Sequence, residues 1–87
     1  MYEKIEVYAK SIDGVKIYRV LKSFKTGLYY VQSLDYLYPP FEQAKIRQHE
    51  KRFFELFFEE DISLRVEGFC DVETAIKFFD ESFESFD

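Results

Sequence analysis

Apolar and polar residues alternate along the first part of the chain with the two-residue period of a half-buried β-strand. Over residues 2–11, the apolar side chains of Ile5, Val7 and Ala9 fall on one face. The opposite face carries polar and charged residues, namely Lys4, Glu6, Tyr8 and Lys10. The pattern predicts a strand with one dry face and one wet face.

Two turn signals follow and divide the next twenty residues. Asp13-Gly14 lies between apolar runs, which is a strong short-range signal for a β-hairpin. Residues 15–24 are therefore predicted to form a second, antiparallel strand. The second turn is Lys25-Thr26-Gly27, where glycine takes a positive φ at no steric cost.

Residues 28–37 are rich in β-branched and aromatic side chains, which favours a third strand. Simple alternation puts Tyr30, Gln32, Leu34 and Tyr36 on one face. The other face then holds Tyr29, Val31, Ser33, Asp35 and Leu37. Because neither face is purely polar, the sheet is expected to be covered on both sides or paired with another sheet.

Residues 41–61 form the longest helical pattern, with no Gly or Pro and many strong helix formers. Pro39-Pro40 before it suits the start of a helix. At about 100° per residue, Ile46, Phe53 and Phe57 fall on one line. Phe54 and Phe58 widen this apolar arc beyond what one sheet covers. Either the C-terminal segment covers the flank of the helix, or another molecule does.

The remaining residues predict one short element and a second helix. Ile62, Leu64 and Val66 alternate with polar residues up to Glu67, which favours a short fourth strand over a loop. Asp71 is placed to cap a C-terminal helix. Its apolar stripe consists of Val72, Ala75, Ile76, Phe79, Phe83 and Phe86. The predicted fold is a single α+β domain over residues 1–87: a three-stranded antiparallel meander packed against a long central helix and a C-terminal helix.

The composition adds two features to the predicted fold, many aromatic rings and an uneven distribution of charge. The 87 residues include 11 Phe and 7 Tyr and carry a net charge of −5. The charge is uneven, because residues 1–58 have ten Lys and Arg against seven Asp and Glu, and residues 59–87 have two against ten. The acidic balance argues against general nucleic-acid binding and leaves room for a basic protein partner.

The sequence also indicates where in the cell the protein is expected. No run of apolar residues is long enough to span a membrane, and the charged start is unlike a secretory signal. A single cysteine, Cys70, cannot form an internal disulfide, which fits a reducing compartment. We therefore expect a cytoplasmic protein.

No motif predicts catalysis, a cofactor or a metal site. His49 is the only histidine, and no nucleophile or orienting partner can be placed beside it by spacing. We expect it to be partly buried and hydrogen-bonded. Cys70 has acidic neighbours, which oppose a reactive thiolate, so we expect a small buried filler. The carboxylate-rich stretches lack the spacing of a calcium loop.

The sequence therefore predicts a small non-enzymatic protein–protein interaction module that forms a homodimer. A narrower version is an immunity-type or inhibitor protein whose acidic C-terminal half binds a basic protein. The alternative is a binder of single-stranded nucleic acid, through the basic hairpin from Lys16 to Lys25 with its interleaved tyrosines. The residues expected at the protein interface are Tyr30, Tyr36, Phe54, Phe58, Phe78, Glu81 and Glu84.

Overall fold

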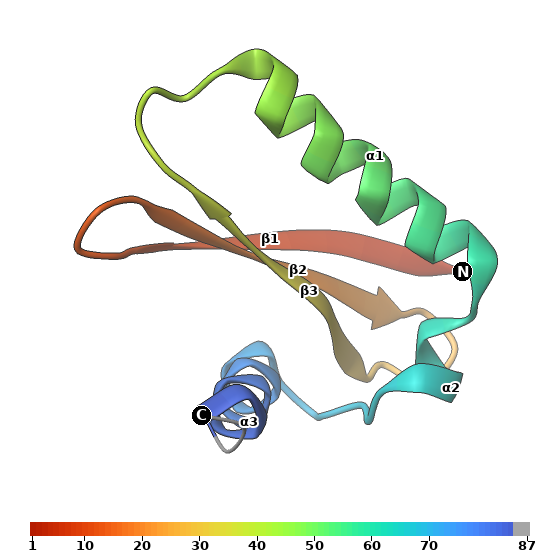
Figure 1. The fold of residues 1–87 in the computed structure, drawn as a ribbon. Coiled ribbons are helices and arrows are strands. Elements are labelled where there is room, and N and C mark those ends of the chain that lie inside the picture. The colour runs from red at the N-terminus through yellow and green to blue at the C-terminus, as the bar shows by residue number, and fades with distance from the viewer. Residues whose placement is uncertain (85–87) are drawn as a thin grey trace.

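The computed structural model describes residues 1–84, except for the side chains of Phe83 and Glu84. The structure is α+β, as predicted: a three-stranded antiparallel sheet of order β1-β2-β3, a long helix and a C-terminal helix. Figure 1 shows the sheet as a middle layer between α1 and α3. The elements are β1 (Tyr2–Lys10), β2 (Val15–Ser23), β3 (Tyr29–Leu37), α1 (Gln43–Glu59), α2 (Ile62–Arg65) and α3 (Val72–Glu84).

Both predicted turns are confirmed. The first joins β1 to β2 with the Ser11 amide donating to the Gly14 carbonyl at 2.9 Å. A side chain at position 14 would collide with the Leu37 carbonyl, because a Cβ there would lie 2.3 Å from its oxygen. The second turn has Gly27 at a φ of 73°, the left-handed conformation that glycine adopts most easily.

The predicted facing of side chains in the second half of β3 was wrong, because β3 contains a β-bulge. Val20 pairs with Val31 and Arg19 pairs with Ser33, so Gln32 is an extra residue on β3. The bulge shifts the alternation by one position. Leu34 therefore lies on the side of Tyr18, whereas Asp35 lies on the side of Arg19.

The sheet is covered on both faces, which confirms one of the two arrangements expected from its rings. On the α3 face, Tyr18, Val20, Val31 and Ala75 form a buried cluster. On the α1 face the buried cluster is Leu21, Tyr30, Phe53 and Ile62. Of the two occupants considered for the flank of the long helix, the C-terminal helix is not the one, because α3 lies against the opposite face of the sheet (Figure 1).

The predicted fourth strand at residues 62–67 was also wrong. These residues begin with the short helix α2, because the Asp61 carboxylate accepts from the Ser63 amide at 3.0 Å and caps it. Strand-like pairing occurs only later, where Phe69 forms a single antiparallel bridge with Tyr29 of β3. The cap predicted for the last helix is confirmed, since the Thr74 amide donates to Asp71 Oδ1 at 2.7 Å.

Two further facts complete the fold. Of the helices within residues 1–84, none has the length and apolar character needed to cross a membrane. The stripe predicted for α3 is confirmed in part, with Ala75 buried and Ile76 and Phe79 packed on the core. Its last members, the Phe83 side chain and Phe86, lie outside the described residues.

Candidate functional site

A chain of ion pairs runs beneath α1 and centres on Arg19. The side chain of Arg19 is buried, with only 2% of the residue exposed. Its Nε lies 2.6 Å from Asp35 Oδ2, and its Nη1 lies 3.0 Å from Glu6 Oε1. The chain continues outward on both sides, through Lys4 to Glu6 at 2.8 Å and through His49 Nδ1 to Asp35 Oδ1 at 3.1 Å. A buried guanidinium is thus matched by two carboxylates.

The carboxylate of Glu6 is stabilised in its charged form. Hydrogen bonds from Lys4 and from the Tyr8 hydroxyl, together with the nearby Arg19 charge, lower the pKa of Glu6 below its usual value. The same hydrogen bond raises the pKa of Tyr8. This end of the network therefore stays ionised at neutral pH.

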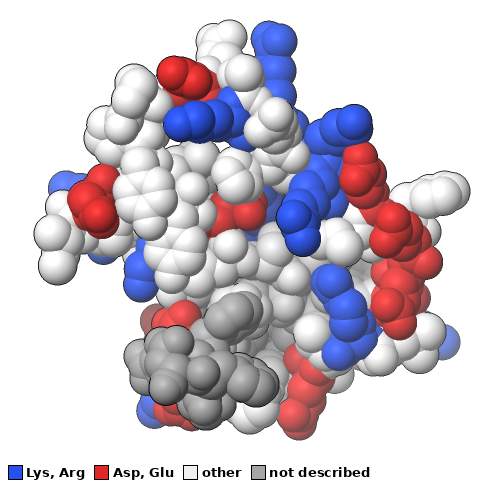
Figure 2. Space-filling view, in the orientation of Figure 1, with Lys and Arg blue, Asp and Glu red and all other residues white. Residues whose placement is uncertain are grey.

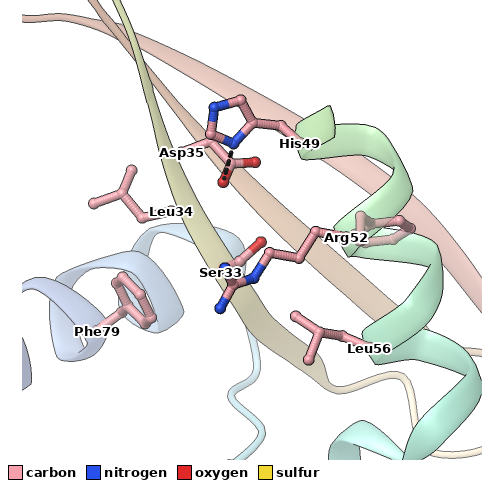
Figure 3. A pocket seen from close by; sticks show the side chains of 8 residues that line it. Ser33, Leu34, Asp35, His49, Arg52, Leu56 and Phe79 are labelled. Atoms are coloured by element: carbon pink, nitrogen blue, oxygen red, sulfur yellow. Dashed lines mark ion pairs between the residues drawn. The ribbon is translucent and has the colours of Figure 1, made fainter. Parts of the chain in front are cut away.

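Next to this network lies a cavity of about 290 Å³ between β3, α1 and α3. Figure 3 shows Arg52 extending from α1 across the cavity towards Ser33 of β3. Arg52 forms no ion pair with any side chain that the structure describes. The residues that line the cavity are Ser33, Leu34, Asp35, His49, Arg52, Phe53, Leu56 and Phe79.

His49 does not have the surroundings of a general base. Its Nδ1 is bonded to Asp35, and Figure 3 shows its other ring nitrogen turned away from Ser33. A nucleophile would have to lie within hydrogen-bond reach of that nitrogen. The expected partial burial of His49 is confirmed, and its Nδ1 lies 3.1 Å from Asp35 Oδ1. Within residues 1–84, no group of three His, Cys, Asp or Glu is placed to hold a metal ion.

The long helix leaves part of its rings uncovered. Phe54 and Phe58 are 60% and 91% exposed, and Phe57 is also exposed beside them. Phe54 and Phe58, with four of their neighbours on α1, line a shallow groove. We call this the outer patch of α1, defined as Arg47, Glu50, Lys51, Phe54, Glu55 and Phe58.

The other predicted interface residues lie in different places. The prediction that Tyr30 lies at an interface is corrected, because its ring is buried against Leu21 and Phe53 and is absent from the surface. Tyr36 is exposed and stacks on Tyr38, and it lies on the same face of the sheet as Leu34 and Tyr18, opposite to α1. Phe78 is exposed on α3 and packs against Phe69, with ring centroids 5.0 Å apart. The predicted rings therefore do not form one surface.

The acidic half offers fewer free carboxylates than its sequence suggests. Asp80 accepts a hydrogen bond from the Tyr18 hydroxyl at 2.8 Å, and Asp71 caps α3. Glu81 is exposed, whereas the side chain of Glu84 lies outside the described residues. On the face shown in Figure 2, acidic and basic side chains are interspersed, with a row of acidic ones along the right margin.

The central cation of the basic hairpin, Arg19, lies in the core and not at the surface. Arg19 is buried and ion-paired, as described above. Lys16 and Lys22 remain at the surface of the sheet, each over a tyrosine ring, at 5.8 Å from Tyr36 and 5.5 Å from Tyr29. Lys16 and Lys22 are half-buried and lie far apart along β2, since six residues of strand span roughly 20 Å.

Cys70 and Arg19 were both misjudged from the sequence. Cys70 is exposed and not a buried filler. The buried pairing of Arg19 with Asp35 was missed, although Arg19 lies within the longest apolar run of the second strand, Ile17 to Leu21. A cation inside such a run is the signal that predicts a buried partner.

No known protein family, curated protein or solved structure shows a significant match to this chain. Its function is therefore inferred from the arrangement of its own residues.

Proposed function

We propose that this protein is a small non-enzymatic protein–protein interaction module that forms a homodimer through the outer patch of α1. The observation that supports this most directly is the exposure of Phe54 and Phe58 on one side of the helix. Single exposed rings are normal on a protein surface, whereas neighbouring rings on one helix face are typical of association surfaces. Rings and Arg are also enriched in protein interfaces.

The charges along α1 favour a second copy as the occupant. Residues 43–51 contain three basic residues and one acidic residue, whereas residues 52–60 contain one basic and three acidic residues. This order opposes the helix dipole, since α1 has no acidic residue in its first turn and no basic residue in its last. Two antiparallel copies of α1 would put each basic half beside an acidic half.

Such a pair has two-fold symmetry, so the same patch serves both copies. Arg47 and Lys51 of one copy would then lie near Glu55 and Phe58 of the other. Cations over aromatic rings and opposite charges across the contact both favour this arrangement. A single helix pair buries about 1,000 Å² or slightly more in total, the lower end for a specific interface, so we expect micromolar affinity.

Sedimentation velocity from low to high micromolar concentration tests the proposal. We expect the wild type to shift from monomer to dimer and Phe54→Ser to remain monomeric. The matched control is Phe24→Ser, because Phe24 is also 60% exposed but lies outside α1. A wild type that stays monomeric, or a Phe24→Ser variant as defective as Phe54→Ser, would refute the proposal.

A charge exchange makes the test specific for antiparallel helices. Arg47→Glu should weaken the dimer, and combining it with Glu55→Arg should restore it, because each substitution reverses one side of the same contact. Failure of the double variant to recover would contradict the antiparallel arrangement even if Phe54→Ser is monomeric.

The two other partner classes have weaker support. A basic protein partner would use Glu81 and the remaining free carboxylates of the acidic half, and Glu81→Lys should then abolish its capture. A single-stranded nucleic-acid partner would rest on Lys16, Lys22 and Lys25 without Arg19. Retention on a single-stranded oligonucleotide at low salt, lost in Lys22→Glu, would favour that class over the dimer.

A further inference from the structure

The outer edge of β3 is open over its second half. At its beginning the edge is occupied, because Tyr29 exchanges both backbone hydrogen bonds with Phe69, at 2.8 and 2.9 Å. The Gln32 carbonyl is also occupied, by Arg65 Nη2 at 3.4 Å. From Ser33 to Leu37, the described residues provide no backbone partner on this side.

The direction of the free groups follows from the register. Tyr29 turns its N–H and C=O away from β2, towards Phe69. Backbone groups alternate in direction along an antiparallel strand, and the bulge at Gln32 shifts the alternation by one residue. Leu34 and Tyr36 are therefore the residues that turn their N–H and C=O outwards. An open row of this kind is a template for another strand.

Two hollows lie along this edge. On the α3 side lies an apolar hollow of about 220 Å³, lined chiefly by Val31, Phe69, Phe78 and Phe79. The other is the cavity into which Arg52 extends, which lies at the edge between α1 and α3 and is lined by residues of both helices (Figure 3). A strand at the edge would send successive side chains alternately towards α1 and towards α3.

One charged side chain of the cavity between α1 and α3 differs from the others in having no ion pair within residues 1–84. Both oxygens of Asp35 are engaged, Oδ2 by Arg19 and Oδ1 by His49. Arg52 has no ion pair among the described residues. The cavity therefore favours a carboxylate opposite the Arg52 guanidinium, with which it would form a charge-assisted hydrogen bond.

We propose that the open edge of β3 binds an extended peptide of a partner protein, antiparallel to β3, with an acidic side chain towards Arg52 and apolar side chains towards Phe78 and Phe79. Main-chain hydrogen bonds at Leu34 and Tyr36 would hold the peptide, and the residues of α1 and α3 beside the edge would select its side chains. The antiparallel direction matches the bridge that Phe69 already makes on the same edge.

A second copy of the sheet fits this edge poorly. The cavity into which Arg52 extends has walls from both helices, with His49 and Leu56 on α1 and Phe79 on α3. A β3 strand from another copy would bring its own two flanking helices, which would meet these walls. A single extended peptide has no such flanks. The edge also differs from the outer patch of α1, so either proposal can fail without the other.

The test uses a fluorescein-labelled peptide of alternating valine and glutamate and measures its anisotropy with the full chain. In antiparallel pairing the valine side chains point towards α3 and the valine amides point towards β3. N-methylation of the valine amides should therefore abolish binding, whereas N-methylation of the glutamate amides should not. Equal loss in both peptides, or no binding of the unmodified peptide, would overturn the proposal.

Two arginines of α1 provide a matched pair for the charge. Arg52→Glu should weaken binding of the valine–glutamate peptide by about tenfold, since a charge-assisted hydrogen bond is lost. Arg52→Glu should in turn bind the valine–lysine peptide, which shows that the variant is folded. Arg47→Glu, on the outer patch, should leave peptide binding unchanged. Equal effects of the two substitutions, or no reversal of charge preference, would refute the role of Arg52.

Discussion

Beneath α3 the sheet presents Tyr18, Val20 and Val31 to an apolar helix face, whereas beneath α1 the neighbouring position Arg19 enters an ion-pair chain with Glu6 and Asp35. The two faces are made by the same three strands. The α3 face is stabilised by apolar area removed from water. The α1 face combines an apolar end, at Leu21 and Tyr30, with a charged end whose stability depends on complete pairing.

This difference explains where the surplus rings lie. On the α1 face, part of the space under the helix is filled by charged groups, and Phe53 is the α1 ring that packs into the core. Phe54 and Phe58 lie on the other side of the helix and stay exposed. The helix α1, which covers the more polar face of the sheet, therefore exposes more aromatic surface to solvent than the described side chains of α3 do.

The largest effect is expected from breaking the ion-pair chain at its centre. Arg19→Ala leaves Asp35 and Glu6 without their buried partner, and removal of one member of a buried pair costs about 3–5 kcal/mol. The free energy of unfolding, measured with urea, should fall by that amount. Lys22→Ala on the same strand is the control, because it removes only a surface contact with Tyr29 worth about 1 kcal/mol or less. Similar losses for both would mean that the two faces do not differ as described.

A smaller effect is expected on the α3 face. Val20 is fully buried, and Val20→Ala removes two methyl groups without exposing a charge. The cost is the lost transfer free energy plus a small cavity, about 2 kcal/mol. The same urea measurement checks it. A loss larger than that of Arg19→Ala would reverse the comparison of the two faces.

The smallest effect on the free energy of unfolding at neutral pH is expected from Glu6 and Tyr18. Their titration changes stability clearly only at acid pH and at alkaline pH, respectively. The pKa of Glu6 is lowered from 4.5, so its contribution is complete above 4.5 and is lost as the pH falls through the folded pKa. On the α3 face, burial and the bond to Asp80 raise the pKa of Tyr18 from 10.0 to about 12. That contribution is complete below pH 10.0 and is lost as the pH rises towards 12.

Two substitutions separate the acid side from the alkaline side in a profile of unfolding free energy against pH. Glu6→Gln should flatten the acid side and also lower the pKa of Tyr8, which loses the bond to Glu6. Tyr18→Phe should flatten the alkaline side and leave the acid side unchanged. If Tyr18→Phe flattened the acid side as well, the two faces would not titrate independently.

Local features of the sequence predicted most elements. The two hairpin turns, the three strands, the long helix and the Asp71 cap depend on residues only a few positions apart, and all are found in the structure. The alternating pattern over residues 62–67 was misread because alternation over so short a segment is outweighed by one side-chain cap from Asp61.

The sequence by itself thus determined the order and type of the three strands and the two longer helices, the uneven charge and the excess of rings over what two helices bury. The tertiary structure alone decided that α1 and α3 lie on opposite faces, that a bulge at Gln32 turns Asp35 towards Arg19, and that Tyr30 is buried while Phe58 is exposed. The physical reason is distance along the chain. Turns and caps are satisfied by near neighbours, whereas burial and ion pairing depend on which remote segments meet, and no local pattern encodes that choice.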